Sequence, residues 1–261
     1  IGFQVLQANT TGVCNVAVGV RALKSNVCGN RNVAIGVRAL EDNTSGGCNV
    51  SVGHEALTNN TTGQYNVAVG TDAMATNTIG TCNIGIGYRS LYDNTTGVSN
   101  VAMGFSSLEN NTTGASNTAV GLQALQDNTT ASNNTAVGAS ALAANTTGDY
   151  NTADGAYALT ANTTANYNTA VGAYALTANT TGANNTAVGA TALDANTTAS
   201  GSKYHGGTTA LKPNSSLEDH SILKIAVDMD NNKIWWGVDA GWMGNADGDN
   251  DGDPTEGETG D

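Results

Sequence analysis

Large side chains are scarce in this sequence. Aromatic residues make up 5% of the 261 positions, and two of them are phenylalanine, whereas Ala, Gly, Asn and Thr dominate. A wide globular core packed from large residues is therefore excluded, and any core must be thin and built from Ala, Val and Leu. Repetition of a short unit is the natural way to extend such a core along a chain.

Cations are scarce as well. Nine Lys and Arg stand against 22 Asp and Glu, for a formal net charge of −13. Phosphate binding needs clustered cations that displace counterions, so we expect no nucleic acid among the partners. Anionic membrane surfaces are disfavoured for the same reason. No apolar run reaches the ~18–20 residues that cross a bilayer, and we therefore expect no membrane insertion.

What the chain does have is a strict internal repeat. An Asn opens a block of the type NVAVG or NTAVG eleven times, always 17 residues apart: Asn15, Asn32, Asn49, Asn66, Asn83, Asn100, Asn117, Asn134, Asn151, Asn168 and Asn185. With this Asn as position 1, the unit reads N-x-A-V-G-x-x-A-L-x-x-N-T-T-G-x-x. Loops of independent domains tolerate insertions. A series without any insertion indicates a solenoid, in which each turn lies in register on the last.

The unit contains segments with different secondary-structure preferences. Positions 2–4 favour a strand and end at a Gly that should mark a bend. Positions 6–12, as in residues 37–43, favour a helix, and the segment Asn-Thr-Thr-Gly is typical of a turn. We therefore predict a mainly β solenoid with one short parallel strand and about one helical turn per repeat. Two columns should be buried, one containing Val18, Ile35, Val52 and Val69 and the other Leu23, Leu40 and Leu57.

Such a unit buries little apolar surface. Stacked strands advance ~4.8 Å per turn, and each turn would bury about one Val or Ile, one Leu or Met and a few Ala. Ordering 17 residues normally requires more burial than this. We therefore expect a homo-oligomer, and a trimer in particular, to supply the missing contacts.

The repeats from Asn168 to Leu193, NTAVGAYALTANTTGANNTAVGATAL, resemble those of bacteriophage tail fibres, especially of marine and cyanobacterial phages. They are also similar to the NxAVG or NxAIG repeats in the heads of trimeric autotransporter adhesins. This resemblance covers residues 1 to about 200, which we assign to a shaft. Residues 201–221 hold a degenerate repeat and a transition.

The C-terminal segment, residues 222–261, has a different pattern. Apolar residues alternate on both sides of an Asp-Asn-Asn turn at residues 230–232, which predicts a β-hairpin. All three Trp lie here, at Trp235, Trp236 and Trp242. The segment resembles the SPRY-like sequence found near the tips of phage fibres.

Together the two resemblances imply a structural shaft of a phage tail fibre leading to a tip that binds a host-surface glycan or protein. The chain would then be located in the virion tail fibre or at an extracellular or cell surface. The alternative is a bacterial extracellular adhesin or filament subunit. A minor alternative is an ice-binding solenoid, because stacked Thr side chains can form a regular array.

One motif has the spacing of a metal loop. Asp247, Asp249 and Asp251 are followed by Gly252 and Glu258, which matches the calcium-loop pattern D-x-D-x-D-G-x5-E. The motif makes calcium the one candidate cofactor of this chain. The competing interpretation of the same residues is an acidic tail without fixed structure.

Four cysteines lie in the repeats. Cys14, Cys48 and Cys82 occupy position 17, immediately before the Asn of every second repeat, and Cys28 occupies another position. Two turns separate equivalent atoms by roughly 9–10 Å, beyond the ~7 Å limit for the Cα atoms of a disulfide. Disulfides within one chain among these three are excluded if the stacking is correct. Bridges between chains and free thiols remain the two alternatives.

No arrangement indicates catalysis, and we expect a protein that is not an enzyme. His54, His205 and His220 are scattered and form no triad with Ser and Asp. A polysaccharide depolymerase would need paired acids in a groove, but the carboxylates of the repeats are sporadic. Asp154 interrupts the Val column between Val137 and Val171. Because a buried unpaired carboxylate is costly, the column cannot be a dry interior at that turn.

Overall fold

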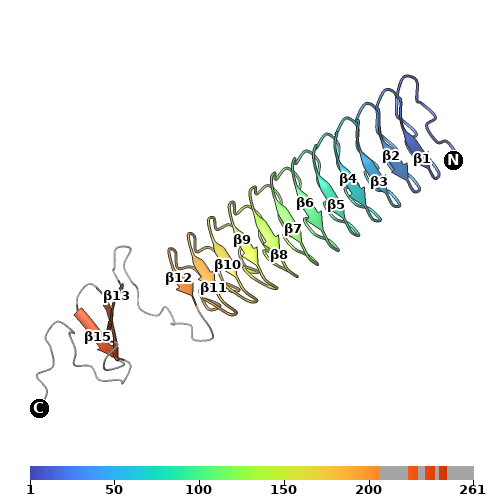
Figure 1. Ribbon diagram of the computed structural model, residues 1–261. Coiled ribbons are helices and arrows are strands. Elements are labelled where there is room, and N and C mark those ends of the chain that lie inside the picture. The colour runs from blue at the N-terminus through green and yellow to red at the C-terminus, as the bar shows by residue number, and fades with distance from the viewer. Residues whose placement is uncertain (206–222, 229–232, 239–240, 246–261) are drawn as a thin grey trace, which may run out of the picture. The chain divides into compact units, whose positions relative to one another are not determined.

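The computed structural model describes residues 1–205 and three later strands at 223–228, 233–238 and 241–245. Each repeat contributes one three-residue strand to a single parallel sheet (Figure 1). The strands of this sheet are β1 (Val16–Val18), β2 (Val33–Ile35), β3 (Val50–Val52), β4 (Val67–Val69), β5 (Ile84–Ile86), β6 (Val101–Met103), β7 (Thr118–Val120), β8 (Thr135–Val137), β9 (Thr152–Asp154), β10 (Thr169–Val171), β11 (Thr186–Val188) and β12 (Lys203–His205).

The strands stack in the register that the repeat predicts. Val16 pairs with Val33, Ala17 with Ala34 and Val18 with Ile35, and the same offset of one repeat continues to β12. The parallel β-solenoid predicted from the sequence is therefore confirmed. The described residues contain no helix, and hence none long and apolar enough to cross a membrane.

The interior is lined by positions 3, 8 and 9 of the repeat. Ala34, Ala39 and Leu40 have no exposed surface, and the Leu column continues through Leu57, with Met74 taking the same place one turn later. The predicted burial of the Leu column is confirmed.

The predicted burial of the Val column is wrong. Val18 and Ile35 are 39% and 41% exposed, because side chains alternate along a strand and position 3 is the one that points inward.

The cross-section is so narrow that small residues are needed opposite Leu. The fifth strand shows this most clearly, since Gly85 replaces Ala at position 3 beside Met74, whose side chain is longer than the Leu side chains above and below it in the column. A Cβ atom on Gly85 would lie 2.9 Å from Met74 Cγ, closer than side chains pack. The interior therefore accepts Ala and excludes Val at position 3.

The predicted helical turn is also wrong. Positions 7 and 9 have left-handed backbone, with φ of 62° at Arg21 and 48° at Leu23, so this segment cannot wind as an α-helix. The amides at positions 7, 9 and 11 bond to neighbouring turns, as where Leu23 N–H donates to the Ala39 carbonyl at 3.0 Å, while Lys24 N–H donates to the Arg21 carbonyl three residues back at 3.3 Å. Helix propensity does not decide the conformation here, because stacking pairs backbone N–H and C=O groups between turns instead of along a helix.

Two columns of buried Asn hold the turns together. At position 12, Asn43 Nδ2 donates to Asn26 Oδ1 at 2.7 Å and to the Gly46 carbonyl at 3.0 Å. At position 1, Asn49 N–H donates to Asn32 Oδ1 at 3.0 Å, and Asn32 Nδ2 donates to the same Gly46 carbonyl at 2.9 Å. Both columns repeat along the stack, with side chains that are buried from Asn26 and Asn32 onward, so a single chain has cohesion beyond its thin apolar core.

The chain divides into two compact units, Ile1–Lys212 and Pro213–Asp261. In the second unit β13 (Leu223–Asp228), β14 (Lys233–Val238) and β15 (Gly241–Asn245) form an antiparallel sheet. Pairing of Val227 with Ile234 and of Asp228 with Lys233 establishes the predicted hairpin. The finer division at residues 200 and 221 stays a prediction.

Candidate association face

The outward side of the parallel sheet is apolar over its first six strands. Positions 2 and 4 point away from the interior, and from β1 to β6 each is Val, Ile or Met. We call this the apolar sheet face: Val16, Val18, Val33, Ile35, Val50, Val52, Val67, Val69, Ile84, Ile86, Val101 and Met103. None of these side chains is fully buried in the single chain, and Val16 is 50% exposed. An apolar patch of this regularity is typical of an interaction surface.

Position 6, just beyond the glycine bend that ends each strand, is also apolar on most turns, with His54 and Thr71 as polar interruptions. Val20, Val37, Phe105 and Leu122 are all exposed. Tyr88 and Phe105 stack on neighbouring turns with ring centroids 5.1 Å apart. This column adds large side chains along one edge of the apolar sheet face.

The outward side changes chemistry after β6. Position 2 becomes Thr from Thr118 to Thr186, while position 4 stays Val except at Asp154. The Asp154 side chain is exposed, and the column is not a dry interior at that turn, as the sequence predicts.

Charged side chains form a ladder along positions 7 and 10, near the N-terminal end. Glu41 Oε2 accepts from Arg38 Nε at 2.7 Å, and Glu41 Oε1 lies 3.4 Å from Arg21 Nη1 and 3.7 Å from Lys24 Nζ. The hydrogen bond with Glu41 is the largest influence that raises the pKa of Arg38 above its usual value. One turn further on, Arg38 Nη1 bonds to Glu55, so the ladder links consecutive turns.

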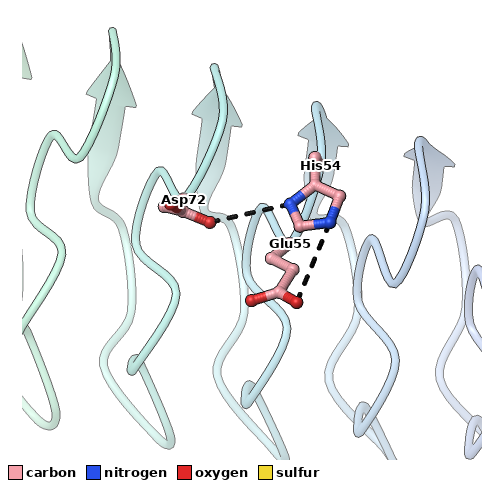
Figure 2. Close-up of side chains that lie close together, drawn as sticks. All are labelled: His54, Glu55 and Asp72. Carbon is pink, nitrogen blue, oxygen red and sulfur yellow. Dashed lines mark ion pairs between the residues drawn. The ribbon is translucent and has the colours of Figure 1, made fainter.

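His54 and Asp72 extend this ladder (Figure 2). His54 Nε2 lies 3.9 Å from Glu55 Oε1, and His54 Nδ1 lies 3.8 Å from Asp72 Oδ1. Sequence reasoning treated His54 as an isolated surface residue and missed this cluster. The signal was present, since position 7 of one repeat stacks on position 7 of the next, which brings Asp72 beside Glu55.

Of the remaining predicted site residues, the structure describes the four cysteines but not the predicted calcium ligands. The four cysteines form no disulfide with one another in the single chain; Cys14, Cys28 and Cys82 are exposed and Cys48 is half-buried. The confirmed stacking supports the argument against disulfides among Cys14, Cys48 and Cys82 within one chain. Asp247, Asp249, Asp251 and Glu258, the predicted calcium ligands, lie outside the described residues, as does His220.

Comparison with known proteins adds no family. No family model, curated protein or solved structure matches the chain. The functional assignment therefore depends on the repeat, the solenoid and its surface.

Proposed function

We propose that this chain is a structural shaft segment of a phage tail fibre, assembled from several copies that pack through the apolar sheet face. The supporting observation is that face, with its twelve Val, Ile and Met side chains on six consecutive turns. A shaft acts as a spacer, so it needs a rigid repeat and no reactive groups, and we assign it no enzymatic activity. The C-terminal unit leads to the tip, which binds a host-surface glycan or protein.

The partner that fits the face is a second copy of the same chain. Its columns repeat at ~4.8 Å per turn, and another copy has the same period and can stay in register over all six turns. Positions 2 and 4 carry no charge between β1 and β8, so two copies would bring no like charges together.

The area is also sufficient. Six turns of positions 2–6 span about 29 by 16 Å, or roughly 1,000 Å² for two chains together. That figure reaches the lower limit for a specific interface. In a trimer each chain would contact two neighbours.

Self-association is tested on the full chain by analytical ultracentrifugation. Val52→Lys combined with Val69→Lys places two charges on the face. We expect the unchanged chain to sediment as an oligomer and this double variant to sediment as a monomer, with the same circular dichroism spectrum for both. The control combines Val27→Lys with Ile79→Lys, which alter exposed apolar residues of the Asn-Thr-Thr-Gly turn, and should remain oligomeric. A monomeric unchanged chain at high concentration, or equal dissociation of both variants, would contradict the proposal.

Two alternatives share the solenoid. An adhesin or filament subunit would use the same association face, and the order of a fibre-like shaft before a SPRY-like segment favours the tail fibre. Antibodies against the chain should label fibres on phage particles by electron microscopy; labelling of bacterial surfaces would support the adhesin.

For the ice-binding alternative, a Thr column does lie on strands from Thr118 to Thr186, but Asp154 interrupts the column beside it.

A further inference from the structure

Three potential metal ligands converge on one side of the third and fourth turns. His54 and Glu55 occupy positions 6 and 7 after β3, and Asp72 occupies position 7 after β4. One ligand atom from each residue can be chosen so that all three lie within 4.8 Å of one another, the only such group in the described part of the chain. Their side chains are 53%, 28% and 24% exposed in the single chain, so an ion could enter from solvent there.

The solenoid places like charges next to each other here. Glu55 and Asp72 are equivalent residues of consecutive turns, so their like charges lie close together and repel each other. Arg38 offsets the charge of Glu55, whereas the basic partner of Asp72 among the described residues is His54. The backbone holds the cluster in place, since Asp72 N–H donates to the His54 carbonyl at 2.9 Å. A cation between these carboxylates would remove the repulsion.

We propose that His54, Glu55 and Asp72 bind one divalent transition-metal ion, with water completing its coordination. An imidazole nitrogen with two carboxylate oxygens suits Zn²⁺, Co²⁺ or Ni²⁺, whereas Ca²⁺ and Mg²⁺ take oxygen ligands. Ligand atoms lie about 2.0–2.2 Å from zinc, which places neighbouring ligands roughly 3.4 Å apart. The three side chains must therefore close by about 1 Å around the ion.

The present geometry indicates how that closure occurs. His54 directs Nδ1 at Asp72 and Nε2 at Glu55, and one ion can use only one of these nitrogens. Nδ1 is the better placed, because Asp72 is short and stacked in the ladder while Glu55 is longer and can swing toward the ion. Glu55 Oε1 contacts Arg38, which leaves Oε2 for the metal. Bound in this way, the ion would link two consecutive turns.

Titration of the metal-stripped full chain tests the proposal. All variants carry Ser at Cys14, Cys28, Cys48 and Cys82, so that thiols cannot bind the ion. We expect isothermal titration with Zn²⁺ to show one site per chain that is lost in His54→Ala and kept in the matched control His205→Ala. Asp72→Asn and Glu55→Gln should each weaken binding at least tenfold. Zn²⁺ should also raise the melting temperature of the parent but not of His54→Ala.

Circular dichroism in the absence of metal checks that each variant is folded. Binding should weaken at low pH, because protons compete with the metal for imidazole and carboxylate ligands. No binding by the folded parent would overturn the proposal. Equal binding by His54→Ala and the parent would place the ion elsewhere and would overturn it as well. Neither result bears on the association face.

Discussion

At the scale of the residue, buried Asn side chains supply cohesion that large apolar side chains supply in an ordinary core. Its amide has both a donor and an acceptor, so identical side chains on successive turns can bond to one another without a partner of another type. The donor left over at position 12 reaches a carbonyl of its own turn, as from Asn60 to Gly63 at 3.1 Å. Both Oδ1 and Nδ2 of Asn60 are thereby paired, which is the condition under which the burial of a polar side chain is tolerated.

Replacement of Asn60 by Ala should be strongly destabilising. It removes the bond to Asn43 Oδ1 at 2.8 Å and leaves Asn77 Nδ2, which donates to Asn60 Oδ1 at 2.8 Å, without that acceptor. We expect a loss of about 2–5 kcal/mol in the free energy of unfolding, measured by urea denaturation. The adjacent Asn59 is half-buried and serves as control, and Asn59→Ala should cost less than about 0.5 kcal/mol. Similar losses for both variants would show that the ladder contributes little.

At the scale of the element, the strand is short because a bend ends it at position 5. Gly36 has φ of 139°, a conformation that side chains rarely adopt, and a Cβ atom there would overlap the Gly53 carbonyl of the next turn. Both constraints come from stacking, since the bend must lie directly on its neighbour. A Gly occupies position 5 in every one of the eleven repeats for this reason.

Gly36→Ala should therefore cost on the order of 3–5 kcal/mol, through backbone strain and displacement of the next turn. Gly47, at position 16, is the control. A Cβ atom there would lie 3.2 Å from the Asn30 carbonyl, and other repeats carry side chains at this position. Gly47→Ala should change the melting temperature little. A mild effect of Gly36→Ala would mean that the turns can shift apart without loss of the fold.

At the scale of the whole solenoid, each turn contacts its neighbours and little else. Stability then follows from the number of turns and the contacts between adjacent ones. Removal of a complete 17-residue unit brings equivalent residues together at the new junction. Removal of a single residue leaves one turn too short to place its Asn residues in both the position 1 column and the position 12 column.

Deletion of residues 100–116 should therefore leave the circular dichroism spectrum per residue unchanged and lower the melting temperature only slightly. Asn117 would then take the place of Asn100 and make the same bonds with its neighbours. Deletion of Thr113 alone should cost at least about 4 kcal/mol, because ladder bonds at positions 1 and 12 are both broken at that turn. Equal tolerance of the two deletions would contradict the requirement for a constant unit length.

The sequence by itself determined the period, the parallel register and the burial of the Leu column, because an uninterrupted repeat places equivalent residues in line whatever their conformation. The register also implied that Glu55 and Asp72 lie close to each other on consecutive turns. Only the tertiary structure decided which side of the strand faces inward. Hydrophobicity favoured Val18 and Ile35, but the interior opposite Leu has room for Ala and not for Val. The same closeness of the turns replaced the expected helix by left-handed residues such as Arg21, since the Arg21 amide donates to the Phe3 carbonyl of the preceding turn and is not available for a bond within its own.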